Sequence, residues 1–176
     1  MITPSDAAHK PAREIADPKE LLLGYLDYYR SVITRKIEGL AGSDLSRSRV
    51  PSGWTPLELV KHLTYMEERW LRWGFMAEQI QSPHGDEDEA GRWHVAPEEP
   101  AAELIGALHA VGERTRRIVS QAELTDIAAP GGRFSEGDSG PRPTLGWILM
   151  YVLQEYARHA GHLDIARELI DHATGE

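Results

Sequence analysis

The sequence contains no cysteine among its 176 residues. The protein itself therefore offers no disulfide framework, no thiolate zinc finger, no iron-sulfur cluster and no catalytic thiol. A chain of this length buries a hydrophobic core without covalent or metal cross-links, so its size does not require a structural metal. Any thiol chemistry performed by this protein must use a sulfur atom that a ligand supplies.

Basic residues are also scarce, since 19 Lys and Arg stand against 28 Asp and Glu and give a net charge of −9. An acidic chain argues against a nucleic-acid partner, because non-specific affinity for phosphate backbones needs a basic surface. Long apolar runs are missing too. The run at residues 147–153 falls far short of the roughly 20 residues that cross a bilayer, so we expect no membrane partner.

Residues 1–16 combine prolines with mixed charges and lack the apolar segment of a secretory signal. We interpret them as a flexible leader. Residues 17–176 are then expected to form a single domain, and without an export signal the expected location is cytoplasmic.

Hydrophobic residues recur every three or four positions in four segments, and no segment alternates as a β-strand does. Asp17 and Thr144 are expected to be N-caps of the first and last of these helices. The second helix has the strongest start signal, a capping box from Thr55 to Glu58 with proline at the first helical position. The predicted helices cover residues 18–42, 56–78, 100–122 and 145–169.

Three long connections, residues 42–53, 81–99 and 123–143, separate the predicted helices. Loops of this length in a compact domain are usually functional or disordered. We interpret the acidic tract from Asp86 to Glu89 in the second loop as solvent-exposed. Four amphipathic helices joined in this way predict an all-α fold, an antiparallel four-helix bundle with long connecting loops and some crossover connections.

Glu155, His159 and His162 occupy one face of the last predicted helix. At 100° per residue, the three side chains span about 60° of the helix circumference. Ile148 and Val152 share this face, which therefore points toward the core. A buried, unpaired carboxylate costs several kcal/mol, so these polar groups need partners or a metal ion.

A Glu and a His four residues apart offer two ligands to one divalent ion, and a third must come from another helix. His62 is the natural candidate, because apolar Leu59 and Leu63 flank it in the second predicted helix. A His, Glu, His set leaves an open coordination position, as catalytic sites do. His162 is either a fourth ligand or a group that orients Glu155 or a substrate. The alternative without metal is a buried polar network that holds the helices in register.

The other aromatic and imidazole side chains give weaker signals. Trp54 and Trp93 lie outside the predicted helices, where they could wall a site, and the other tryptophans are expected in the core or as loop anchors. The sequence has neither a GxSxG nor an HExxH motif, so it does not support a serine hydrolase or a zincin. Five histidines are expected at the surface or in a loop: His9, His84, His94, His109 and His172.

Two segments carry a resemblance to a known family: residues 50–63, VPSGWTPLELVKHL, and residues 155–168, EYARHAGHLDIARE. Together they resemble the DinB-like superfamily, and more narrowly its branch of mycothiol-dependent S-transferases. The resemblance covers about residues 17–176 and implies a four-helix bundle with one metal ion. It also implies that the ligands are His62 on the second helix and Glu155 and His159 on the last.

The same resemblance implies a function in which a metal ion, expected to be zinc, activates the thiolate of mycothiol for attack on an electrophile. The implied partners are a small-molecule thiol and an electrophile, with a homodimer as the family-level expectation. His162 is expected to move the proton, and Trp54, Arg69 and Arg158 are expected to contact the bound molecules. Two alternatives stay open, a metal-dependent hydrolase of the same fold and a non-catalytic, stress-associated binding protein.

Overall fold

The structure is a computed structural model, and it describes residues 9–135, 137 and 140–174. These residues contain isolated β-bridges but no strands. The predicted all-α fold is therefore confirmed. The helices, in chain order, are α1 (Pro18–Ile37), α2 (Gly42–Leu45), α3 (Pro56–Trp70), the π-helix η2 (Leu71–Phe75), α4 (Ala101–Ser120) and α5 (Leu145–Asp171).

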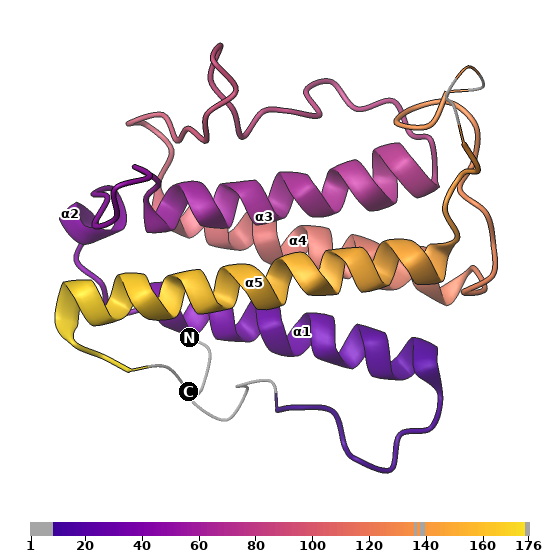
Figure 1. Cartoon of the computed structure of the whole chain (residues 1–176), viewed down its shortest axis with the longest axis horizontal. Coiled ribbons are helices and arrows are strands. Elements are labelled where there is room, and N and C mark those ends of the chain that lie inside the picture. Colours follow the sequence, from indigo (N-terminus) through magenta and orange to yellow (C-terminus); the bar gives the residue numbers. More distant parts are fainter. Residues whose placement is uncertain (1–8, 136, 138–139, 175–176) are drawn as a thin grey trace.

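The four long helices, α1, α3, α4 and α5, lie side by side (Figure 1). Helix α5 runs antiparallel to α3, because His62 meets His159 near one end of the pair whereas Trp70 meets Tyr151 near the other. Helices α1 and α4 are antiparallel as well. The neighbouring pairs α1 with α5 and α3 with α4 run parallel. The antiparallel packing expected from the sequence thus holds for α3 with α5 and for α1 with α4.

The parallel packing of α3 and α4 explains the long connection between them. The chain leaves η2 at one end of the molecule and has to return along α3 before α4 begins (Figure 1). We call residues 76–100 the crossover loop. Its path carries the loop over the outer side of α3, and this path decides what covers the site described below.

The predicted helix starts agree with the structure. The Asp17 side chain accepts hydrogen bonds from two backbone N–H groups of the first turn of α1. Thr55 Oγ1 accepts from the Glu58 N–H at 3.3 Å, and Glu58 Oε2 accepts from the Thr55 N–H at 2.8 Å, which completes the capping box. Thr144 caps α5 in the same way.

The first helix ends earlier than predicted. It stops at Ile37 instead of continuing to Ala41 and Gly42, because Gly39 adopts a left-handed conformation with φ of 82°. Residues 42–45, which were expected to belong to a loop, form the short helix α2.

The end of the second helix also differs from the prediction. Regular α3 stops at Trp70, and the π-helix η2 continues the chain to Phe75. The predicted end at Glu78 is wrong, because Ala77 has a φ of 52° that no right-handed helix accommodates.

The carboxylate of Glu67 on α3 is fully buried in the core. It accepts hydrogen bonds from Arg30 of α1 (Nη2 at 2.5 Å and Nε at 3.2 Å) and from the Tyr156 hydroxyl of α5 at 2.6 Å. Gly112 of α4 leaves room for this arginine, since a Cβ there would lie 2.7 Å from Arg30 Nε. An ion pair buried in this way is tolerated only when its polar atoms find partners. The Glu67 network therefore ties α1, α3 and α5 together.

The predicted leader falls partly outside the described residues, since the structure describes none of residues 1–8. Residues 9–16 lie against α1. Pro11 packs on Gly24 so closely that a Cβ there would be 2.8 Å from the ring, and Lys10 Nζ is 5.7 Å from the centre of the Tyr28 ring. In the described part of the chain, no helix has both the length and the apolar character that crossing a membrane demands.

The Glu67 network predicts a large effect of a small substitution. Glu67→Gln keeps the shape of the side chain but leaves Arg30 with only the half-buried Asp27 as an anionic partner. We expect the free energy of unfolding, measured by urea denaturation, to fall by about 2–4 kcal/mol. Arg92→Gln, at an exposed ion pair with Asp88, is the control and should cost less than about 0.5 kcal/mol. Equal losses in the two variants would contradict a structural role for Glu67.

Candidate functional site

Three potential ligands meet where α3 packs against α5: His62 from α3, and Glu155 and His159 from α5. One ligand atom from each lies within 4.8 Å of the other two. His159 Nε2 is 3.3 Å from Glu155 Oε2, which matches the separation of about 3.3–3.5 Å between ligands of a tetrahedral ion with bonds near 2.0–2.1 Å. Two imidazoles and a carboxylate suit zinc and similar divalent ions. The structure thus brings together the three predicted ligands, and their donor set fits a metal ion.

Local sequence explains why these side chains converge. Glu155 and His159 are four residues apart on α5, so they lie one above the other on the same face. Leu59 and Leu63, on either side of His62 along α3, are fully buried and hold that face of α3 against the core. His159 is buried, whereas His62 and Glu155 are half-buried at the edge of the core. The cluster therefore lies at the edge of the core, with part of the surface of His62 and Glu155 exposed.

Asp86, in the crossover loop, is a site residue that the sequence analysis missed. The interpretation of the tract from Asp86 to Glu89 as solvent-exposed is wrong for Asp86, whose side chain is fully buried. Its Oδ2 lies 3.1 Å from His62 Nδ1, and its two oxygens accept hydrogen bonds from Arg69 at 2.5 and 3.1 Å. Burial would raise the pKa of Asp86, but the hydrogen bonds from His62 and Arg69 bring it below its ordinary value. Asp86 can remain charged inside the protein because both partners donate to it.

The contact with Asp86 determines which nitrogen of His62 faces the cluster. A carboxylate at Nδ1 favours the tautomer with its proton there, which leaves the lone pair of Nε2 directed toward the other potential ligands. One residue in the sequence could have indicated that an anion lies beside His62. Arg69 follows His62 by two turns on the same face of α3. In the structure Arg69 is buried, and it donates to Asp86 and to the Pro83 carbonyl. A buried arginine on that stripe requires an anion from elsewhere in the chain.

Trp93 covers the other side of His62. The two rings are stacked, with centroids 4.0 Å apart and planes inclined by 21°, and Trp93 also meets the edge of His159 with centroids 5.4 Å apart. The loop holds this position through a hydrogen bond from the His94 N–H to the Asp86 carbonyl at 2.8 Å. The crossover loop therefore contacts His62 twice, through an aspartate that orients it and a tryptophan that shields it from water.

The other residues expected at the site lie at different distances from the cluster. His162 is adjacent, since its Nδ1 is 3.2 Å from His159 Nδ1. Trp54 is next to His162, with ring centroids 6.0 Å apart. Arg158 is exposed on α5 and influences His159 through its charge. His162 and Trp54 thus border the cluster, whereas Arg158 lies at the surface.

The environment of His159 favours its neutral form. Burial, together with the nearby His62, His162 and Arg158, lowers the pKa of His159 to about 3. A neutral imidazole is the form that binds a metal ion, so His159 needs no deprotonation step to act as a ligand near pH 7.

The remaining histidines are exposed, as predicted. Trp147 differs from the prediction, because its side chain is 52% exposed on α5 and does not belong to the core. The exposed histidines are His9, His84, His94, His109 and His172.

Fold and site together define a class of protein, a helical bundle that presents a His, Glu and His donor set between two antiparallel helices and beneath a crossover loop. A protein-family model described as Mycothiol-S-transferase matches residues 21–172. The chain belongs to this family, which confirms the resemblance found in its sequence. Among curated proteins, no sequence matches this chain.

The low pKa of His159 predicts how the stability of the metal-free protein, prepared with a chelator, depends on pH. The folded-state pKa lies below the unfolded value of about 6.5, so the unfolded chain binds the proton first. Stability that depends on neutral His159 is complete above pH 6.5 and decreases as the pH falls toward 3. In NMR spectra of the folded, metal-free protein, the His159 ring resonance should show no titration step between pH 8 and pH 4.5. A His159 step near pH 6.5 would contradict the buried, neutral assignment.

Proposed function

We propose that the protein is a metal-dependent S-transferase that uses the thiolate of mycothiol to attack an electrophile. Its membership of the Mycothiol-S-transferase family supports a mycothiol-related transfer reaction. The observation that carries the metal dependence is the approach of His62, Glu155 and His159 to within 4.8 Å of one another.

The chemistry of the reaction explains why a metal ion is useful in this protein. A free thiol has a pKa of about 8.5, and only the thiolate is a good nucleophile. A divalent ion, expected to be zinc, held by the three ligands would supply the positive charge that favours the thiolate at neutral pH. Three protein ligands leave room for one from outside, and the chain has no cysteine to provide it. The reactive sulfur would therefore come from mycothiol.

The surrounding residues keep the ligands in place. Asp86 accepts the Nδ1 proton of His62, and this contact fixes the ring with Nε2 toward the cluster. With an ion bound at the Nε2 that faces Glu155, His159 would carry its proton on Nδ1 and would donate it to Nδ1 of His162. This contact supports His162 as a positioning residue for His159 more directly than as the group that moves the thiol proton. Each histidine ligand thus has its own hydrogen-bond acceptor.

The proposal is tested by metal analysis together with a conjugation assay. Wild-type protein reconstituted with zinc should conjugate mycothiol to a bimane electrophile, and His62→Ala and His159→Ala should lose both bound zinc and at least about 100-fold in rate. His109→Ala, at an exposed position on α4, should retain both properties.

Two results would contradict parts of this proposal. Full zinc occupancy in both His62→Ala and His159→Ala would contradict the proposal that these residues bind the metal ion. Equal consumption of the electrophile with and without mycothiol would favour a hydrolase of the same fold, with water at the open position.

Asp86 gives a second prediction about the same site. In Asp86→Asn the side chain keeps its size but loses the charge that fixes His62, so zinc should bind about 10–100-fold more weakly in competition with a chelator. The absorption spectrum of the cobalt-loaded protein should change as well, because it reports the geometry of the ligands. Glu89→Gln, an exposed substitution in the same loop, is the matched control. If zinc affinity and the cobalt spectrum stay at wild-type values while only thermal stability falls, Asp86 stabilises the fold but does not orient His62 for metal binding.

A further inference from the structure

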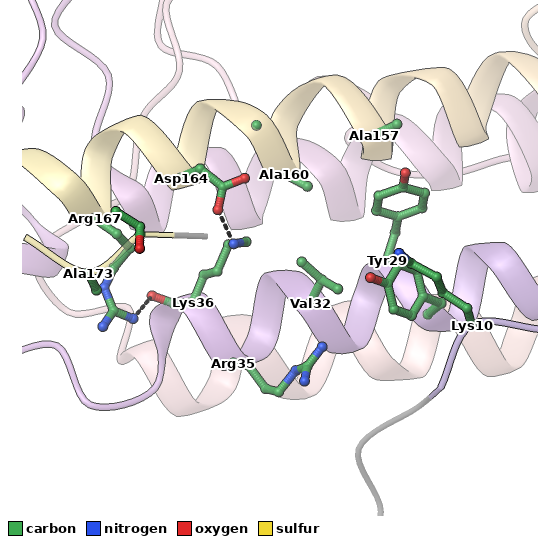
Figure 2. Close-up of a pocket in the computed structure, with 13 residues that line it drawn as sticks. Lys10, Tyr29, Val32, Arg35, Lys36, Ala157, Ala160, Asp164, Arg167 and Ala173 are labelled. Atoms are coloured by element: carbon green, nitrogen blue, oxygen red, sulfur yellow. Dashed lines mark hydrogen bonds and ion pairs between the residues drawn. The ribbon is translucent and has the colours of Figure 1, made fainter. Parts of the chain in front are cut away.

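A hollow lies between α1 and α5 (Figure 2), and none of the residues that line it belongs to the His62, Glu155 and His159 cluster. Its volume is about 460 Å³, and Ala157, Gly161 and Asp164 line it from α5. These residues lie on the face of α5 opposite to Glu155 and His159, which are turned toward α3. An adjoining cavity of about 540 Å³ shares Tyr29 and Ala157 with the first. We call the two together the α1/α5 groove.

One end of the groove is basic, although the chain carries a net charge of −9. Asp164 is the acidic residue in its lining, where it pairs with Lys36 (Figure 2). Arg35 is exposed, and Lys10 Nζ lies near the face of the Tyr28 ring, so neither charge is buried against a carboxylate. The basic residues that line this end are Arg35, Lys36 and Arg167, of which Arg167 pairs with Asp171, whereas Lys10 lies beside Tyr29, nearer the middle of the groove (Figure 2).

The other end of the groove is apolar. Trp147 and Met150 line it, and they are 52% and 57% exposed, which is unusual for large apolar side chains. Tyr25 at this end and Lys36 at the basic end are three turns apart on α1, or about 16 Å. The remaining lining residues of this end are Tyr29, Tyr151, Leu153, Gln154 and Ala157.

Small residues on α5 form the floor between the two ends. Ala157, Ala160 and Gly161 leave the hollow open between the helices. A Cβ added at Gly161 would meet no heavy atom within 4 Å, so a larger side chain there would enter the open space of the groove without displacing its neighbours.

We propose that the α1/α5 groove binds an amphipathic organic anion of the long-chain carboxylate class. The carboxylate would lie beside Arg35 and Lys36, and the apolar chain would pass Lys10 and Tyr29 toward Trp147. The basic end selects an anion, and the apolar end distinguishes this ligand from a small inorganic anion. Cavities of this size are typical of small-molecule sites. The site is separate from the proposed transferase reaction and does not depend on it.

Calorimetric titration of the intact, zinc-reconstituted protein with dodecanoate, below its micellar concentration, tests the proposal. We expect saturable binding at one site, with acetate and dodecanol each binding at least 10-fold more weakly because one lacks the chain and the other the charge. Gly161→Leu should weaken dodecanoate binding at least 10-fold. The matched control is Gly106→Leu, because Gly106 is exposed on α4 and a Cβ there would also meet no heavy atom within 4 Å. This variant should bind dodecanoate as wild type does.

The basic end is tested by a charge substitution. Arg35→Gln should weaken dodecanoate binding about 5- to 10-fold, whereas Arg117→Gln, which is exposed on α4, should not change it. Zinc content should be unchanged in all four variants, which separates this test from the test of the metal site.

Three results would overturn the proposal. The first is equal affinity of wild type and Gly161→Leu for dodecanoate, and the second is dodecanol binding as tight as dodecanoate binding. The third is a light-scattering result in which wild type is a dimer and Gly161→Leu is a monomer. The last result would mean that a second copy of the chain occupies the groove.

Discussion

The Glu67 carboxylate is fully buried on α3, and it accepts hydrogen bonds from Arg30 on α1 and Tyr156 on α5. Tyr156 directly follows Glu155 in the chain, and His62 lies five residues before Glu67 on α3. A shift of one helical turn between α3 and α5, about 5.4 Å, would separate Tyr156 from Glu67 and leave a buried carboxylate short of a partner. The same shift would move His62 away from Glu155. The axial alignment of α3 and α5 that gives Glu67 its hydrogen bonds therefore also brings the three potential metal ligands together.

The direction of the helices has a comparable consequence. Because α3 and α4 are parallel, their connection returns along α3, and the returning chain places Asp86 and Trp93 on either side of His62. A hairpin between antiparallel helices would be short and would leave this end of α3 uncovered. The crossover loop is therefore part of the site, and its length follows from the topology of the bundle.

Sequence reasoning succeeded where the signal is local. The caps at Asp17, Thr55 and Thr144 follow from residue type and spacing within one turn, and the shared face of Glu155 and His159 follows from helical geometry. It failed for Asp86, because an aspartate in an acidic loop has the same local pattern whether it is solvated or buried. Only the tertiary path of the loop, which places Asp86 beside Arg69, distinguishes the two cases.

Tertiary packing likewise decides the environment of the residues that periodicity alone misassigned. Trp147 stands at the start of α5, where a large aromatic residue is expected in the core, yet it lies on the groove side and stacks on Tyr151. The second helix was expected to continue to Glu78, but Ala77 adopts a left-handed conformation and the last turn is a π-helix. No helix propensity of alanine predicts such a conformation, since alanine favours the regular helix.

The two histidine ligands of the proposed site depend on different parts of the structure. His159 is oriented by His162, three residues further along the same helix, so this contact persists as long as α5 is folded. His62 is oriented by Asp86, which reaches it only when the crossover loop is in place. Opening of the loop would therefore release one ligand from its acceptor and leave the other unaffected. In the proposed reaction, the hold of His62 on the ion would therefore depend on the position of the crossover loop, whereas the hold of His159 would depend on α5 alone.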